Sequence, residues 1–277
     1  MAAVLALLSS LLWGTGDFLA GYLSRRRSPF AVLGGSQVVG FVVMVLVATV
    51  TMSWGADPGG YLVWGVLASL SGAGALLAFY TALATGPMGV VSPISALGVL
   101  VPLAVGLFRG ETPAPLQYIG ILLAIVGVVL ASGPEISGAA GLRPVVLAVV
   151  AAVGFGLFFV FLAAGAQEST IMTMTVQRGT TTLIIVATVL VARRGVGGLQ
   201  RSDIPWLVAI GVFDIAANLL FGLSTTEGLL AIVSVLGSLY PVMTVVLAWA
   251  VLRERLAPAQ YIGVAVALAG VAAISAG

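Results

Sequence analysis

Ten apolar stretches, each long enough to cross a lipid bilayer, follow one another along this 277-residue chain. A helix needs about 20 mostly apolar residues to span roughly 30 Å of hydrocarbon. Short breaks rich in glycine, proline and arginine separate the stretches and are typical of turns. We expect the spans to cover residues 2–24, 29–52, 61–84, 87–108, 113–133, 144–166, 169–192, 204–225, 228–250 and 256–276. The pattern predicts an all-α polytopic membrane protein that forms a single transmembrane domain.

The composition supports this fold class. The chain is 61% hydrophobic and only 7% charged, with a mean hydropathy of +1.22, whereas a soluble domain is usually about 25% charged. A surface that faces lipid needs no charged cover. The first span lacks both a basic segment before it and a small-residue cleavage site, so we expect it to be a retained helix and not a signal peptide.

Several classes of function are disfavoured by residues that the chain lacks. It has no cysteine and no histidine, so thiolate and imidazole metal sites are excluded and the usual general base is missing. It has no phosphate-binding G-x-x-x-x-G-K motif. The net charge of +2 comes without any basic run that would hold nucleic acid. We therefore expect no enzymatic activity, no metal, no cofactor and no nucleic-acid partner.

The sequence repeats itself halfway. Residues 117–120 and 260–263 both read Gln-Tyr-Ile-Gly, an offset of 143. Leu97-Gly98 matches Leu236-Gly237 at an offset of 139, and Trp13-Gly14 is similar to Phe155-Gly156 at 142. This predicts two five-span copies, residues 1–138 and 139–277. Because five is odd, the second copy must be inverted, an arrangement typical of secondary transporters with a substrate site near the membrane midplane.

The same segments carry a resemblance to a known family. Residues 108–120 and 252–263 place an Arg-Gly-Glu or Arg-Glu turn before Pro-x-Gln-Tyr-Ile-Gly, and residues 238–241 read Ser-Leu-Tyr-Pro. Over its whole length the chain resembles the EamA family of the drug/metabolite transporter superfamily. The resemblance implies spans 113–133 and 256–276 at the periphery and the spans beginning at 2, 61, 87, 144, 204 and 228 around a cavity. It implies transport of amino acids, choline-like cations, nucleotide sugars or other metabolites, without specifying which.

Two deep charges of opposite sign suggest a pair. Charged groups within a span cost at least about 2.5–3.5 kcal/mol, so each needs a reason. Arg178 and Asp214 lie in consecutive spans at similar depth. One interpretation is a buried ion pair that joins the two helices; the other is that Arg178 contacts an anionic group on a substrate. The resemblance adds that the family often has an arginine at this position, where the first copy has Gln37 nearby.

Asp17 is a third deep charge, and the sequence offers no second deep cation for it. It is either a structural carboxylate, capped by hydroxyls, water or the arginines at 25–27, or a functional group that faces the cavity. In the functional interpretation it serves as counter-ion for a cationic substrate or as a protonatable coupling site.

Aromatic residues near these charges favour a cation, since a positive group is attracted to aromatic faces. Trp13 and Asp17 share a helix face at a spacing of four, while Asp214 and Asn218 form a stripe that continues to Phe221. Taken singly, each ring has ordinary helix packing as its alternative. The predicted substrate-binding or coupling residues are Asp17, Trp13, Phe79, Tyr80, Phe155, Phe159, Asp214, Asn218 and Tyr240.

The arginines predict an orientation. Nine of the eleven lie in breaks on the side opposite the N-terminus, one lies on the N-terminal side and one is Arg178. The positive-inside rule then places both termini outside, whereas members of the resembled family usually keep both termini inside.

The sequence predicts a secondary-active or facilitated transporter of a small polar or cationic metabolite across the plasma membrane by alternating access. An exporter of amino acids or other amphipathic metabolites, and a structural membrane subunit without transport, are the alternatives. The expected partners are a small-molecule substrate and the bilayer. A coupling proton or sodium ion, and a homodimer, stay open at this point.

Overall fold

The described part of the chain is helical throughout, with connecting turns and no strand. We analysed a computed structural model, which describes residues 1–24, 26–85, 88–132, 141–192, 198–253 and 257–277. A chain in lipid must satisfy its backbone hydrogen bonds internally, and a helix does so within one segment. Large apolar side chains such as Leu77 and Phe108 are exposed, whereas alanine, serine and threonine dominate the interior. This arrangement suits a protein whose outer surface contacts lipid.

The described residues of the first half of the chain form six α-helices and two short 3-10 turns. They are α1 (Ala2–Ser24), α2 (Pro29–Val50), η1 (Ser53–Gly55), α3 (Pro58–Thr85), α4 (Met88–Ala96), η2 (Leu97–Val99), α5 (Leu100–Phe108) and α6 (Pro115–Ala131). The predicted span 87–108 is thus divided into α4, η2 and α5. Helix α4 continues through position 93, and the 3-10 turn ends at Val99, before Pro102 in the first turn of α5.

The second half has one very long helix followed by shorter ones. The elements are α7 (Leu142–Ala192), η3 (Arg201–Asp203), α8 (Ile204–Glu227), α9 (Leu230–Gly237), α10 (Tyr240–Leu252) and α11 (Pro258–Ala276). Pro241 lies in the first turn of α10, directly after the break from α9, where its missing N–H costs little.

Helix α7 is continuous where two spans, 144–166 and 169–192, were expected. Ser169 has non-helical dihedral angles (φ −159°, ψ 106°), so α7 turns there and consists of two arms. The Ser169 hydroxyl accepts a hydrogen bond from the backbone N–H of Met172 (3.2 Å), as an N-cap residue does. The second arm therefore begins afresh without an intervening loop.

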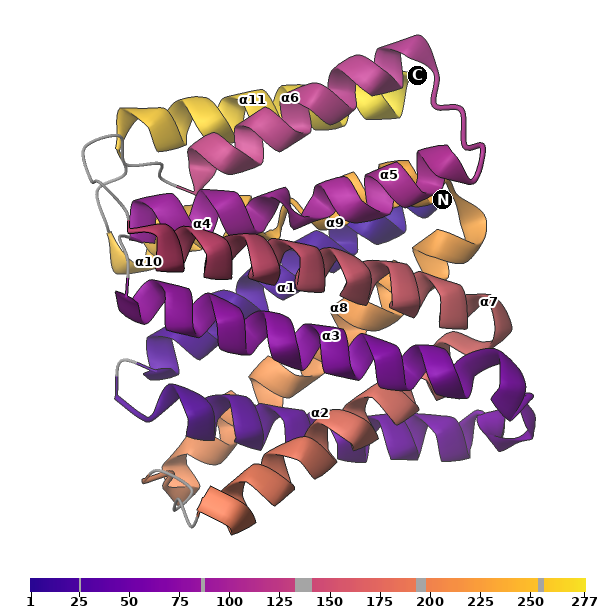
Figure 1. Cartoon of the computed structure of the whole chain (residues 1–277), viewed down its shortest axis with the longest axis vertical. Coiled ribbons are helices and arrows are strands. Elements are labelled where there is room, and N and C mark those ends of the chain that lie inside the picture. Colours follow the sequence, from indigo (N-terminus) through magenta and orange to yellow (C-terminus); the bar gives the residue numbers. More distant parts are fainter. Residues whose placement is uncertain (25, 86–87, 133–140, 193–197, 254–256) are drawn as a thin grey trace.

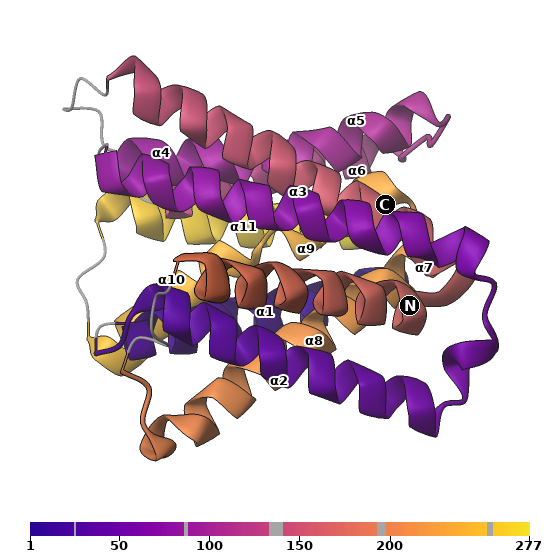
Figure 2. The ribbon, with the colours of Figure 1, turned by 60° about the horizontal axis from the view of Figure 1, so that its bottom comes forward.

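The helices lie side by side in one body (Figure 1), with α6 and α11 at one end and α2 at the other. Seven of the described helical runs are long and apolar enough to cross a membrane, and two shorter apolar ones accompany them. Both termini lie at the same face, which we call face A; Figure 2 shows the same from another angle. The opposite face, where α1 ends and α2 begins, is face B.

Glycines bring α6 and α11 into close contact. A side chain at Gly120 would meet the backbone of Gly270, and one at Gly263 would meet the backbone of Gly127. Position 120 thus faces 270 and position 127 faces 263, so the two helices run antiparallel. Close backbone approach through small residues is how helices associate in lipid, where the hydrophobic effect does not hold them together.

Candidate functional site

The second arm of α7 places Arg178 in the interior, where it joins three helices. Its guanidinium Nη2 lies 2.6 Å from Oδ2 of Asp214 on α8, and Nη1 donates a hydrogen bond to Oε1 of Gln37 on α2 (2.5 Å). The Arg178 side chain is only 4% exposed, against 32% for Asp214. Opposite charge and a polar neighbour offset the cost of holding a guanidinium away from water.

Asn218 completes the surroundings of Asp214. One turn along α8, its side-chain Nδ2 donates to the Asp214 carbonyl (2.7 Å) and to Oδ1 of the Asp214 carboxylate (3.0 Å). Both carboxylate oxygens of Asp214 are therefore engaged, one by Arg178 and one by Asn218. The Oδ1 atom of Asn218 itself is buried and has no hydrogen-bond partner among the described residues.

Asp17 lies beside this cluster but takes no part in it. Gly16 packs against the α8 backbone: a Cβ atom added at Gly16 would lie 4.0 Å from the backbone nitrogen of Asp214. The carboxylate of Asp17 is close enough to interact electrostatically with the carboxylate of Asp214 and with the Tyr240 phenol. Nevertheless, Asp17 is exposed, and in the described part of the chain no hydrogen bond or ion pair reaches its carboxylate.

Asp17 lies on the side of α1 that faces α8 and α10, since its carboxylate interacts electrostatically with Asp214 and with the Tyr240 phenol. Gly16 contacts α8, and Gly14 contacts the backbone of Tyr240 on α10. Trp13, one turn before Asp17 on the same helix face, is buried. The interior is consequently open at Asp17 and closed one turn nearer face A.

An aromatic cluster closes the interior around Trp13. The Trp13 ring lies 5.4 Å from Phe159, 5.6 Å from Phe221 and 6.4 Å from Tyr240, centroid to centroid. Phe159 and Phe221 are themselves 4.9 Å apart, and Phe221 is completely buried. Aromatic pairs in tilted and edge-to-face geometry at these distances are attractive.

The remaining predicted aromatics lie on the first arm of α7 and on α3. Phe79 and Phe155 meet edge to face at 6.0 Å. The side chain of Tyr80 lies outside the described residues. Phe155 also lines a pocket of about 270 Å³, open space at its mouth included, between the two broken helices. The pocket is lined by Ser95, Ala96, Gly98, Val99, Phe155, Phe159, Ser238, Tyr240 and Pro241.

The structure brings most of the predicted site residues together and adds others that the sequence analysis did not include. The structure brings Asp17, Trp13, Asp214, Asn218 and Tyr240 into one region, with Phe159 in its aromatic cluster and Phe155 along the pocket. Four further residues belong to this region but were not among the predicted site residues: Gln37, Ser95, Phe221 and Ser238. Phe221 could have been predicted because it continues the Asp214–Asn218 stripe on α8. Gln37 could have been predicted because it lies 141 residues before Arg178, close to the offset of the repeat.

The chemistry of the region is that of binding. An accessible carboxylate beside aromatic rings attracts a cation. The described residues contain no group of three or more acidic, histidine or cysteine side chains that could hold a metal ion.

Comparison with known proteins gives three findings. The EamA-like transporter family matches residues 1–133 and again residues 142–276. An uncharacterized protein of Methanocaldococcus jannaschii is 29% identical over 133 residues, which are 47% of this chain and 96% of that protein. One solved crystal structure matches 98% of this chain and 95% of its own, with a TM-score of 0.79 and 19% identity. At that identity the crystal structure shows a shared fold alone.

Proposed function

Because this chain belongs to the EamA-like transporter family, we propose that it moves a small polar or cationic metabolite across the plasma membrane by alternating access. The observation that carries the proposal is the exposed carboxylate of Asp17 in the bundle, to which no described residue is paired. A membrane protein retains such a group at a considerable cost, and an intramembrane acid that faces a cavity is a candidate site for substrate or coupling ion.

The charges of the region favour a substrate with a positive group. When both acids are ionised, Asp17 and Asp214 carry two negative charges against the single positive charge of Arg178, which leaves one net negative charge. Asp214 is already paired with Arg178 at 2.6 Å, so the uncompensated charge resides on Asp17. The Tyr240 phenol interacts electrostatically with Asp17 and its ring contacts Trp13, and aromatic rings attract organic cations.

We further propose that the fold is an inverted repeat of ten membrane crossings. The two arms of α7 count as two crossings, and each broken helix, α4–α5 and α9–α10, counts as one. Both termini lie at face A, which requires an even number of crossings. The family match in two successive blocks of similar length supports two copies.

The contacts between matched positions also support this repeat. At the offset of 143, Gly120 corresponds to Gly263 and Gly127 to Gly270. The contact of Gly120 with Gly270 and that of Gly263 with Gly127 are therefore the same contact made twice, between antiparallel helices. An antiparallel pair with this property is related by a two-fold axis that inverts one copy relative to the other.

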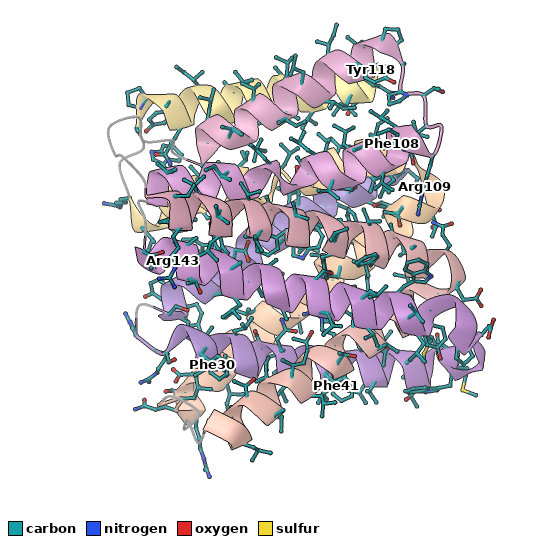
Figure 3. All side chains as sticks on the ribbon, in the orientation of Figure 1. Phe30, Phe41, Phe108, Arg109, Tyr118 and Arg143 are labelled. Atoms are coloured by element: carbon teal, nitrogen blue, oxygen red, sulfur yellow. The ribbon has the colours of Figure 1, made fainter. Side chains whose placement is uncertain are left out.

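The orientation that we propose places face B in the cytoplasm. Among described residues, Arg26, Arg27, Arg143, Arg201 and Arg253 belong to face B. Figure 3 shows Arg143 and Arg109 at opposite faces. By the positive-inside rule, both termini are then external.

Cysteine labelling tests this orientation, since the chain has no cysteine of its own. An Ala2→Cys variant should react with an impermeant maleimide in intact cells, and a Ser28→Cys variant should not. The reverse result would place the termini inside.

Counter-flow in proteoliposomes tests transport directly. Vesicles that contain the purified protein are loaded with an unlabelled quaternary ammonium compound, a zwitterionic amino acid or an organic anion, and uptake of the labelled counterpart is measured. We expect uptake of the cation, abolished in Asp17→Asn and retained in the control Thr15→Ala, whose hydroxyl bonds only within its own helix (2.7 Å). Unchanged uptake by Asp17→Asn, or uptake of the anion alone, would contradict the proposal.

An exporter of amino acids or other amphipathic metabolites is the second candidate. An ammonium group would meet Asp17, and the apolar part of the molecule would contact the rings around Trp13. Uptake of the zwitterion in preference to the quaternary ammonium compound would favour it. Failure of every compound class to exchange would favour a structural subunit.

A further inference from the structure

A second cluster of aromatic and basic side chains lies at face B, where α1 ends and α8 begins. The rings of Tyr22 and Trp206 lie tilted at 37° to each other with their centroids 5.5 Å apart. The guanidinium carbon of Arg26 lies 5.4 Å from the centre of the Tyr22 ring, and its Nη2 is 3.3 Å from the Tyr22 hydroxyl. Arg26, Tyr22 and Trp206 thus form one layered arrangement, which we call the face-B cluster.

An ion pair holds the two segments of the cluster together. Nε of Arg27 lies 2.7 Å from Oδ2 of Asp203, and its Nη2 donates to Oε1 of Gln200 (2.7 Å). Asp203 also accepts a hydrogen bond from the Gln200 backbone (2.8 Å). The connection between α1 and α2 is therefore fastened to the turn before α8, and the charges of Arg27 and Asp203 cancel.

Two arginines beside this ion pair keep their full charge. Arg26 precedes Arg27, and Arg201 follows Gln200, so the fastened segments bring both to the same part of face B. Both are exposed, and no acidic side chain in the described part of the chain pairs with either. The result is a positive surface with two guanidinium groups that no described acidic side chain neutralises, next to the tilted pair of Tyr22 and Trp206.

We propose that the face-B cluster binds the phosphodiester headgroup of an anionic phospholipid. The cluster lies at the ends of two membrane helices, at the depth where headgroups are found and where tryptophan and tyrosine gather. Guanidinium groups bind phosphate oxygens in a two-pronged geometry. Trp206 is 39% exposed and Ile204 in the same turn is 53% exposed, which gives acyl chains an apolar surface beside the charges.

The apolar neighbours of the cluster select a lipid over a free phosphate ion. A soluble anion would gain nothing from the exposed side chains of Ile204 and Trp206, whereas a lipid contacts them with its chains. The site is separate from Asp17 and depends on neither the substrate nor the transport mechanism.

Native mass spectrometry of the purified full-length chain, titrated with phosphatidylglycerol or with phosphatidylcholine, tests the proposal. We expect one phosphatidylglycerol molecule to bind more tightly than any phosphatidylcholine. Each arginine should contribute about fivefold in affinity, so Arg26→Gln/Arg201→Gln should bind about 25-fold more weakly. The matched control is Arg143→Gln, an exposed arginine on the same face outside the cluster, which should bind like the wild type.

Three results would overturn the proposal. They are equal affinity for phosphatidylcholine, an equal loss in Arg143→Gln, or full competition by glycerol 3-phosphate at concentrations that match the lipid. The first would mean that charge is not recognised, the second that only overall charge matters, and the third that the site recognises a soluble phosphate. If the double variant fails to fold, the single variants Arg26→Gln and Arg201→Gln carry the same test at about fivefold each.

Discussion

The outer pair α6–α11 and the centre of the bundle differ in how far the two halves of the chain resemble each other. In the outer pair, matched positions make matched contacts, Gly120 with Gly270 and Gly263 with Gly127. In the centre, matched positions hold different residues: Arg178 corresponds to Gln37 at an offset of 141, and Asp17 to Phe159 at 142. The outer pair thus repeats one close backbone contact, whereas the polar groups of the centre lie at positions where the two copies differ.

Geometry explains why divergence is tolerated in one place and not in the other. At the outer pair, even a single added carbon would overlap the backbone of the partner helix, so only glycine fits. In the centre, the interior is partly open, as the exposure of Asp17 shows. There the two copies are free to contribute a carboxylate on one side and an aromatic ring on the other.

The largest destabilisation should come from the central ion pair. Removal of one partner leaves a buried charge uncompensated and typically costs about 3–5 kcal/mol. We therefore expect Asp214→Asn, which leaves the 4% exposed Arg178 without its counter-charge, to lower the free energy of unfolding measured by SDS titration in mixed micelles. Arg178→Met, which leaves the 32% exposed Asp214, should lower it less. The double variant should lose less than the sum of the two. Simple additivity would mean that the two groups are not coupled in the membrane.

A smaller loss is expected in the outer pair. Gly127→Ala places a methyl group against the backbone of Ala267, and overpacking of this kind usually costs about 1–3 kcal/mol. Gly74→Ala on α3 is the matched control, because nothing lies within 4 Å of its added Cβ. The control should be neutral or slightly stabilising, since alanine favours a helix over glycine. Equal melting temperatures for both variants would contradict the close α6–α11 contact.

The smallest effect on stability should come from Asp17, despite its central place in the proposed function. Asp17→Asn removes a charge that has no partner in the described residues and that lies near another carboxylate. We expect the free energy of unfolding to change by less than about 0.5 kcal/mol, or to rise. A loss comparable to that of Asp214→Asn, in the same SDS titration, would make Asp17 a structural contact and would give the centre a supporting role like that of the outer pair.

Sequence alone determined the features that depend on local patterns. The apolar stretches predicted the helices, because the requirement to satisfy backbone hydrogen bonds in lipid acts on each segment separately. Matched motifs such as Gln-Tyr-Ile-Gly predicted a repeat, and the rarity of charge within spans singled out Asp17, Arg178 and Asp214.

Tertiary structure alone decided which of these groups meet. Three deep charges allow several pairings, and helix rotation and packing placed Arg178 against both Asp214 and Gln37, whereas Asp17 has no partner among the residues that the structure describes. Likewise, hydropathy predicts two apolar spans on either side of Ser169. It does not predict that they follow each other directly within α7, which depends on the dihedral angles of Ser169 and on its hydrogen bond with the Met172 N–H. Hydropathy and motif spacing depend on position along the chain, whereas contacts depend on how helix faces orient in three dimensions, which a linear pattern does not encode.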